Sequence, residues 1–315
     1  MKIEEIHIST PDKTIDAQDF DIEKWRREMP IDYYKLAKLL ICAEHPLVKA
    51  ELFRTIYQAI QLHIPDTLYK YVSLSAKESS NEKRFDSLLK SRLYLAEVST
   101  LNDPFDCKAY YYNADALTKY DALKPYNGRI IDDFSSLLRV VSLTANGVQS
   151  LPMWAHYANN HEGFCVSYDM TDKCNNLLRS CTFPVFYTND RIDITSVMDS
   201  FVMILQNELK TQSAAGKKEI LIDDLTVVLL ASLLCNVKQR SWSYENEYRC
   251  TEGATAPGLP YVYAKAKGIY IGMKCKEDHA KRLQEIGKTM NIPVFKMEFE
   301  EMSENYSLSA AKVSD

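Results

Sequence analysis

The order of strand-like and helix-like segments is the feature that most constrains how this chain folds. Apolar residues recur at helical spacing through residues 19–63, and from residue 66 onward short runs rich in β-branched and aromatic residues mix with helical patterns. A βαβ series would alternate strictly, and this chain does not. We therefore predict an α+β fold with a helical segment over residues 1–65, a core over 66–300 and a polar tail over 301–315.

Individual elements of this core can be placed from their composition and spacing. The predicted strands cover residues 67–74, 92–96, 137–143, 164–168, 247–251, 261–264, 269–271 and 294–299. The predicted helices cover residues 81–90, 151–161, 194–212, 218–235 and 277–290. Gly163 stands where a left-handed residue is expected to end the second of these helices.

Charge and apolar runs restrict the partners of the protein. The 315 residues carry 38 Lys and Arg against 43 Asp and Glu, so the net charge of −5 gives no strong signal for nucleic-acid binding. The most apolar stretch, residues 225–235, is too short to span a membrane, and the N-terminus has no signal-peptide pattern. We expect a cytoplasmic protein with reduced cysteines, no membrane partner and no metal site, because the His and Cys spacings fit no zinc pattern.

The segment of residues 241–249, S-W-S-Y-E-N-E-Y-R, holds the densest group of ionisable side chains. In an extended backbone Glu245, Glu247 and Arg249 would share one face. Repulsion between two neighbouring carboxylates raises the pKa of one of them, and an adjacent arginine lowers it again. The three side chains could therefore be tuned for hydrogen bonding or acid–base chemistry. The alternative is a solvated strand face with a single ion pair.

Two further segments carry unusual residues. In M-W-A-H-Y, a helix would place Trp154 and Tyr157 on one stripe and His156 on another; the aromatic rings could bind a ligand or form core. In residues 101–106, L-N-D-P-F-D, the polar residues before proline indicate a turn held by hydrogen bonds from side chain to backbone.

Taken in order, four motifs resemble those of a large bacterial family of uncharacterised function. They are L-Y-K-Y at residues 68–71, N-D-P-F-D at 102–106, M-W-A-H-Y at 153–157 and W-x-Y-E-x-E-Y-R at 242–249. The resemblance covers about residues 66–299 and implies no activity by itself.

More distantly, the chain resembles ADP-ribosyltransferases. Their core has a first strand with His or Arg after an aromatic residue, where this chain has Tyr69-Lys70. A second strand is matched around Ser142, and a last strand opens with a glutamate, here Glu247 within the pair Glu245-x-Glu247. The resemblance implies a split mixed or antiparallel sheet, NAD as the substrate and an unknown acceptor.

The resemblance also implies roles for individual residues. Glu247 would stabilise positive charge on the ribose, and Glu245 would orient or deprotonate the acceptor. The predicted catalytic residues are Glu247, Glu245 and His156. The predicted cofactor-binding residues are Tyr69, Lys70, Trp154, Tyr157 and Arg249.

Two other classes of function fit the same residues. One is a binding module without enzymatic activity that holds a nucleotide, another small molecule or a partner protein, in which Glu245, Glu247 and Arg249 serve recognition or structure. The other is a metal-dependent hydrolase or nuclease that uses His156 with the two glutamates. Nucleotide binding without turnover would indicate the first, and metal-dependent cleavage that is lost in His156→Ala would indicate the second.

Overall fold

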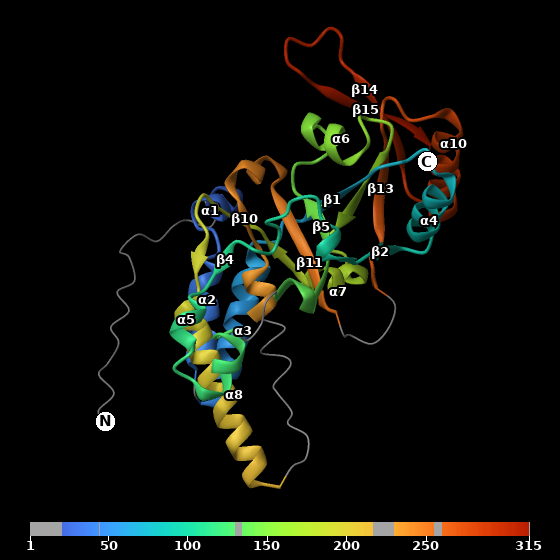
Figure 1. Ribbon diagram of the computed structural model, residues 1–315. Coiled ribbons are helices and arrows are strands. Elements are labelled where there is room, and N and C mark those ends of the chain that lie inside the picture. Colours follow the sequence, from blue (N-terminus) through green and yellow to red (C-terminus); the bar gives the residue numbers. More distant parts are fainter. Residues whose placement is uncertain (1–20, 44, 130–133, 217–229, 255–259, 315) are drawn as a thin grey trace. The chain divides into compact units, whose positions relative to one another are not determined.

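The computed structural model describes residues 21–43, 45–129, 134–216, 230–254 and 260–314 (Figure 1). The chain forms two compact units, residues 1–31 and 32–315. The described residues of the first unit, 21–31, contain helix α1 (Ile22–Glu28), at whose start the Asp21 carboxylate accepts a hydrogen bond from the Lys24 amide. No helix among the described residues is long and apolar enough to cross a membrane.

A mixed sheet is the frame of the second unit, which confirms the α+β prediction at the level of fold class. The strands follow the order β15-β14-β13-β6-β1-β5-β11-β7, and β3 also pairs with β5. Neighbouring strands are antiparallel except β13 and β14, which are parallel and joined by a helix. The bounds are β1 (Thr67–Val72), β3 (Ala96–Glu97), β5 (Leu138–Thr144), β6 (Phe164–Asp169), β7 (Thr182–Pro184), β11 (Glu247–Gly253), β13 (Ala266–Ile271), β14 (Val294–Phe299) and β15 (Leu308–Ser314).

The sheet is split between β1 and β5. These two strands share one residue pair, Tyr69 with Thr144, whereas β1 pairs along its whole length with β6 and β5 pairs along its whole length with β11. Beyond the single pair the two strands separate. The position of this split decides where the candidate site lies.

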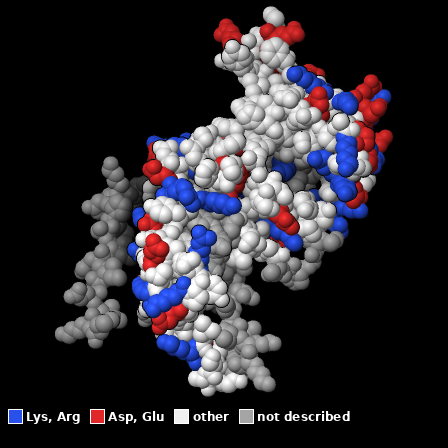
Figure 2. Space-filling model, viewed as in Figure 1, with Lys and Arg blue, Asp and Glu red and all other residues white. Residues whose placement is uncertain are grey.

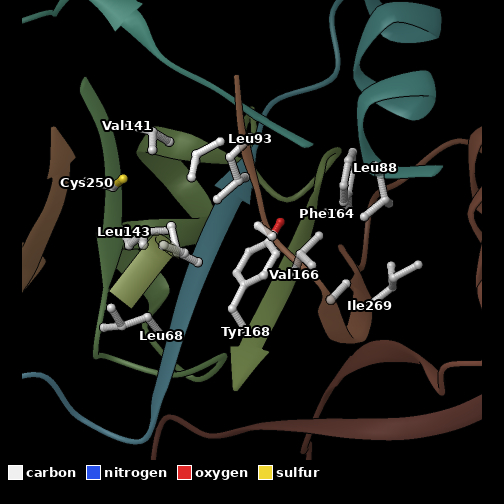
Figure 3. Close-up of a cluster of buried hydrophobic side chains, with 14 of the residues drawn as sticks. Leu68, Leu88, Leu93, Val141, Leu143, Phe164, Val166, Tyr168, Cys250 and Ile269 are labelled. Atoms are coloured by element: carbon white, nitrogen blue, oxygen red, sulfur yellow. The ribbon is translucent and has the colours of Figure 1, made fainter. Parts of the chain in front are cut away.

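The two faces of β1 belong to different cores because side chains alternate along a strand. Leu68 and Val72 join the larger core with helices α4 (Glu78–Leu89) and α10 (Glu277–Met290), part of which Figure 3 shows. Tyr69 and Tyr71 join a smaller core with helix α6 (Leu151–Tyr157) on the opposite face.

A group of helices packs beside the β7 end of the sheet. Helix α2 (Tyr33–Cys42) packs against α3 (Pro46–Leu62) and α8 (Thr195–Ala214), and α3 contacts β7. The predicted boundary at residue 65 therefore does not separate two compact units. Of the predicted helix over residues 218–235, residues 218–229 lie outside the described residues. Residues 230–234 are helical.

Short elements complete the fold. The paired short strands are β2 (Arg92–Tyr94) with β12 (Tyr261–Tyr263), β4 (Tyr110–Tyr111) with β9 (Ile192–Asp193), and β8 (Phe186–Thr188) with β10 (Val237–Gln239). The short helices are η1 (Val98–Thr100), α5 (Ala114–Leu117), η2 (Asp121–Tyr126), η3 (Phe134–Leu137), η4 (Lys173–Asn175), α7 (Asn176–Ser180) and η5 (Arg240–Glu245).

The structure corrects two predictions about the backbone. The polar tail is wrong for residues 308–314, which form β15 because their backbone groups pair with the outer edge of β14 and Leu308 enters the smaller core. Gly163 is not left-handed: Asn159, Asn160 and His161 have positive φ instead. Glycine is still needed at residue 163, since a Cβ there would lie 2.1 Å from the carbonyl oxygen of Val72.

Candidate functional site

A pocket of about 340 Å³ opens beside the single residue pair that joins β1 to β5. Its walls come from β1, β5, β10, η5, β11 and α6, together with the N-D-P-F-D segment. Six of the eight predicted site residues line it: Tyr69, Lys70, His156, Tyr157, Glu245 and Glu247.

Three neighbouring strands bring the predicted residues into register. Tyr69 on β1 is opposite Thr144 on β5, and Thr144 is opposite Glu247 on β11. Next to this row, the Lys70 ammonium crosses the split and donates a hydrogen bond to the carbonyl oxygen of Ser142 over 2.9 Å. The three strands that correspond to the first, second and last strands in the resemblance to ADP-ribosyltransferases are β1, β5 and β11. They are therefore adjacent at one point in the sheet.

Glu245 and Glu247 come together by a different route from the predicted one. Glu245 ends η5, Asn246 is left-handed with a φ of 45°, and β11 begins only at Glu247. The prediction that an extended backbone aligns all three residues is thus wrong for Glu245 and correct for Glu247 and Arg249. The Thr144 hydroxyl fixes the turn by donating to the carbonyl oxygen of Glu245 over 2.6 Å.

Lys238 on β10, which the sequence analysis missed, lies between three carboxylates. Its Nζ is 2.7 Å from Oε2 of Glu245, 3.1 Å from Oε2 of Glu247 and 3.9 Å from Oδ2 of Asp106. The ring of Trp242 covers the ammonium with its centroid 4.9 Å away. Lys238 and the three acidic side chains are at most 4% exposed. The alternative of a solvated strand face is therefore wrong.

Arg249 is a structural cation rather than a ligand-binding one. Its Nε and Nη2 donate to the two carboxylate oxygens of Glu247 over 2.8 and 3.0 Å, Nη2 also donates to Asp106, and Nη1 donates to the carbonyl oxygen of Cys235 over 3.0 Å. The side chain is fully buried and does not line the pocket. The prediction that Arg249 binds the cofactor is wrong, because its donors are already used within the protein.

The two glutamates have opposite pKa shifts. Burial raises the pKa of both carboxyl groups. At Glu247 the charges of Arg249 and Lys238 outweigh burial and hold the pKa well below its usual range. At Glu245 burial prevails over the attraction of Lys238, and the charge of Glu247 adds to the rise, so the pKa of Glu245 is raised. Such a divergence separates a permanent anion from a group that can exchange a proton.

The M-W-A-H-Y segment contributes Met153, His156 and Tyr157 to the pocket, and Met153 and Trp154 to the smaller core. The Tyr157 hydroxyl donates to Oε1 of Glu245, and Nδ1 of the exposed His156 is 3.0 Å from the Tyr244 hydroxyl. Trp154 is fully buried, donates Nε1–H to the carbonyl oxygen of Val148 over 2.7 Å and packs edge-on against Tyr71. The prediction that Trp154 binds the cofactor is therefore wrong, and its alternative as a core residue is correct.

The N-D-P-F-D segment has a structural half and a charged half. Oδ1 of Asp103 accepts a hydrogen bond from the Phe105 amide over 2.9 Å, which confirms the predicted turn. Asp106 contacts Arg249 and approaches Lys238, a role that the turn prediction did not include. The sequence did hold a signal for this role. Asp106 is a second acidic residue that the turn does not need, because Asp103 already accepts the hydrogen bond that holds the turn.

Three of the four motifs thus meet at one place through side-chain contacts: Tyr157 with Glu245, His156 with Tyr244, and Asp106 with Arg249. The fourth motif supplies Tyr69 and Lys70 from β1. In the part of the chain that the structure describes, no three His, Cys, Asp or Glu residues are arranged to hold a metal ion.

A comparison with family models finds that residues 153–250 match a family described as a protein of unknown function (DUF2971). This stretch contains the M-W-A-H-Y and W-x-Y-E-x-E-Y-R motifs. Neither the curated proteins nor the solved structures yielded a match. Similarity to a family of unknown function is therefore shown over these residues.

Proposed function

We propose that this protein transfers ADP-ribose from NAD⁺ to an acceptor in the pocket of Tyr69, Lys70, Glu245 and Glu247. The observation that carries the proposal is the row of Tyr69, Thr144 and Glu247 across β1, β5 and β11. The resemblance to ADP-ribosyltransferases requires the first, second and last strands to supply one site, and in this sheet those strands are neighbours.

The two glutamates supply different parts of the reaction. The bond between C1′ of the ribose and the nicotinamide nitrogen breaks, nicotinamide leaves with the electron pair, and positive charge develops on the ribose. The fixed negative charge of Glu247 stabilises that charge. An acceptor nucleophile then bonds to C1′ and gives its proton to Glu245, whose raised pKa suits a general base.

Lys70 and Tyr157 orient the substrate in this scheme. The Lys70 ammonium gives one hydrogen bond to the carbonyl oxygen of Ser142 and has two more N–H donors for ribose or phosphate oxygens. Burial lowers the pKa of Lys70, although the charge of Glu247 opposes the shift. The Tyr157 ring lies on the pocket wall and can stack on a flat ring while its hydroxyl holds Glu245.

One observation favours a second candidate, a nucleotide-binding module without turnover. Both oxygens of Glu247 already accept hydrogen bonds, from Nε and Nη2 of Arg249 and from Lys238. A ribose hydroxyl would have to share these acceptors. In the second candidate the charged cluster holds the pocket walls together, and the ligand is bound without being cleaved.

Release of nicotinamide by the purified protein distinguishes the candidates. We expect turnover of NAD⁺ that falls at least about 100-fold in Glu247→Gln and in Glu245→Gln, the size of effect typical when one electrostatic or acid–base group is lost. Glu252→Gln is the matched control, because Glu252 lies on the same strand but is exposed. Far-ultraviolet circular dichroism and thermal unfolding establish that each variant is folded.

Two results would contradict parts of this proposal. Full turnover by folded Glu247→Gln would remove the assigned role of this residue. Binding of NAD⁺ in calorimetry without any nicotinamide release, in a preparation whose native fold is verified, would favour the binding module. The acceptor is sought separately by incubating the protein with labelled NAD⁺ and a cell extract. Label that appears on other proteins with the unchanged protein, but not with Glu245→Gln, would support the assignment of Glu245 as the general base.

A further inference from the structure

A second and larger cleft, of about 560 Å³, opens on the other side of the split between β1 and β5. The pocket described above, which Glu245 and Glu247 line, is called the carboxylate pocket from here on. The cleft shares three lining residues with it: Lys70, Ser142 and Leu101. Its further walls come from α4, β2, β5, β6 and Tyr261 of β12. Figure 2 shows a hollow with basic side chains inside it and along its border.

The cleft carries four cations and, among the described residues that line it, no carboxylate. The cations are Lys70, Lys83, Arg84 and Arg92. Within the described part of the chain, Lys83, Arg84 and Arg92 form no ion pair with an acidic side chain; the Arg92 guanidinium only lies over the Tyr261 ring at 5.8 Å. This contrasts with the carboxylate pocket, where Lys238 lies among acidic groups.

Helix α4 is built to present these charges to the cleft. Ser80, Lys83, Arg84 and Ser87 lie three and four residues apart and so occupy one face of the helix, and all four line the cleft. Glu82 and Asp86 fall on the opposite face, where Asp86 pairs with Lys90 at 2.8 Å. The separation of charge across α4 leaves a positive field on the cleft side that favours an anion.

The interior of the cleft is apolar. Its lining includes Val141 of β5, Phe164 and Val166 of β6, and Leu93 of β2, which lies between Val141 and Phe164 in Figure 3. The half-buried Tyr261 and the more exposed Tyr94 contact each other edge to face at the β2–β12 pair, with centroids 5.6 Å apart. A ligand with an anionic end and a flat or apolar body matches this combination, and the volume is in the range of small-molecule sites.

We propose that this basic cleft binds a phosphorylated small molecule, with the phosphate held by Lys83, Arg84 and Arg92 and an aromatic or apolar body against the β5 and β6 side chains. Arg suits a phosphate because its planar fork gives two parallel hydrogen bonds. The inference goes beyond the proposed function, because three of the four cations do not line the carboxylate pocket. The phosphate belongs either to a separate ligand or to the NAD⁺ of the proposed reaction. In the second case NAD⁺ would reach both the cleft and the carboxylate pocket, and Lys70, which lines both, would contact it.

Calorimetry with ADP as the probe tests the cleft. We expect ADP to bind, adenosine to bind at least tenfold more weakly, and the double variant Lys83→Gln/Arg84→Gln to lose at least tenfold in affinity for ADP. Lys90→Gln is the matched control, since Lys90 also belongs to the α4 segment but pairs with Asp86 outside the cleft. Its affinity for ADP should stay within about twofold of the unchanged protein.

The proposal is overturned if the double variant binds ADP as the unchanged protein does, if adenosine binds as tightly as ADP, or if neither ADP nor pyrophosphate binds to the folded full-length chain. Competition between ADP and NAD⁺ for the protein identifies the ligand to which the phosphate belongs. Displacement of NAD⁺ by ADP supports the cleft as the phosphate site of NAD⁺, and simultaneous binding supports it as the site of a separate ligand. Glu247→Gln tests the proposed transfer reaction without touching the three cations, so the two proposals can fail independently.

Discussion

Replacing Arg249 with methionine would leave two buried carboxylates without their main partner. Arg249 gives two hydrogen bonds to Glu247 and one each to Asp106 and to the carbonyl oxygen of Cys235, and it is fully buried. Methionine fills a similar volume and supplies no charge. Lys238 would then be the one cation in contact with Glu247 and Asp106 among the described residues.

The expected loss in the free energy of unfolding is about 3–5 kcal/mol, the usual cost of removing one partner from a buried ion pair. This is a large share of the roughly 5–15 kcal/mol that stabilises a typical protein. With a denaturant dependence of about 3 kcal/mol per M of urea, the unfolding midpoint should fall by roughly 1–1.7 M.

Urea unfolding followed by tryptophan fluorescence measures this loss. The matched control is Arg282→Met, which breaks a surface pair with Glu285 and should change the free energy of unfolding by less than about 1 kcal/mol. In the double variant Arg249→Met/Glu247→Gln the two losses should not add, because they share one interaction. A loss below about 1 kcal/mol for Arg249→Met, or strict additivity in the double variant, would refute the reasoning.

The pH dependence of the same variant follows from the direction of the Glu247 shift. The pKa of Glu247 is lower in the folded than in the unfolded protein, so its stabilising contribution is present above the unfolded value of about 4.3 and is lost as pH falls further. The difference in unfolding free energy between the unchanged protein and Arg249→Met should therefore shrink as pH falls below about 4.3.

Two further variants test the packing around the site. Trp154→Ala should lower the free energy of unfolding by about 3–5 kcal/mol, as for other large core deletions, while the affinity of the folded protein for NAD⁺ stays within about threefold; a selective loss of binding would contradict the core role. Gly163→Ala should cost about 1–3 kcal/mol in thermal unfolding because its Cβ meets the Val72 carbonyl, whereas Gly268→Ala, with contacts of 3.5 Å or more, should cost clearly less; equal losses would refute the steric explanation.

The framework of the fold could be predicted from the sequence where composition and spacing agree. The strands predicted near residues 67–74, 137–143 and 247–251 are β1, β5 and β11, because β-branched and aromatic residues are concentrated there. The helix predicted over residues 277–290 is α10, whose acidic first turn and left-handed Asn291 mark both ends. Order in the sheet could not be predicted, since it depends on pairings between distant segments.

The charged cluster shows why only part of the site could be predicted. Glu245 and Glu247 are two residues apart, and this proximity in the sequence suggested their proximity in space. Tyr157 lies in a distant motif and was assigned to the same site only through the resemblance to ADP-ribosyltransferases. Lys238 lies in a three-residue strand, and its role depends on pairing with β8, which no local pattern indicates. A carboxylate pair of this kind nevertheless requires a buried cation, because two buried negative charges without one would neutralise by taking up a proton.

The number of cations in the cluster decides how the two glutamates differ. Arg249 contacts Glu247 through two donors and does not contact Glu245 through any hydrogen bond among the described residues, whereas Lys238 contacts both. Glu247 therefore keeps its charge, and Glu245 is left with one cation, a neighbouring anion and the Tyr157 hydroxyl. A second cation beside Glu245 would lower its pKa as well, and the two carboxyl groups would then no longer differ. The asymmetric position of Arg249 thus accounts for the opposite pKa shifts of the two glutamates.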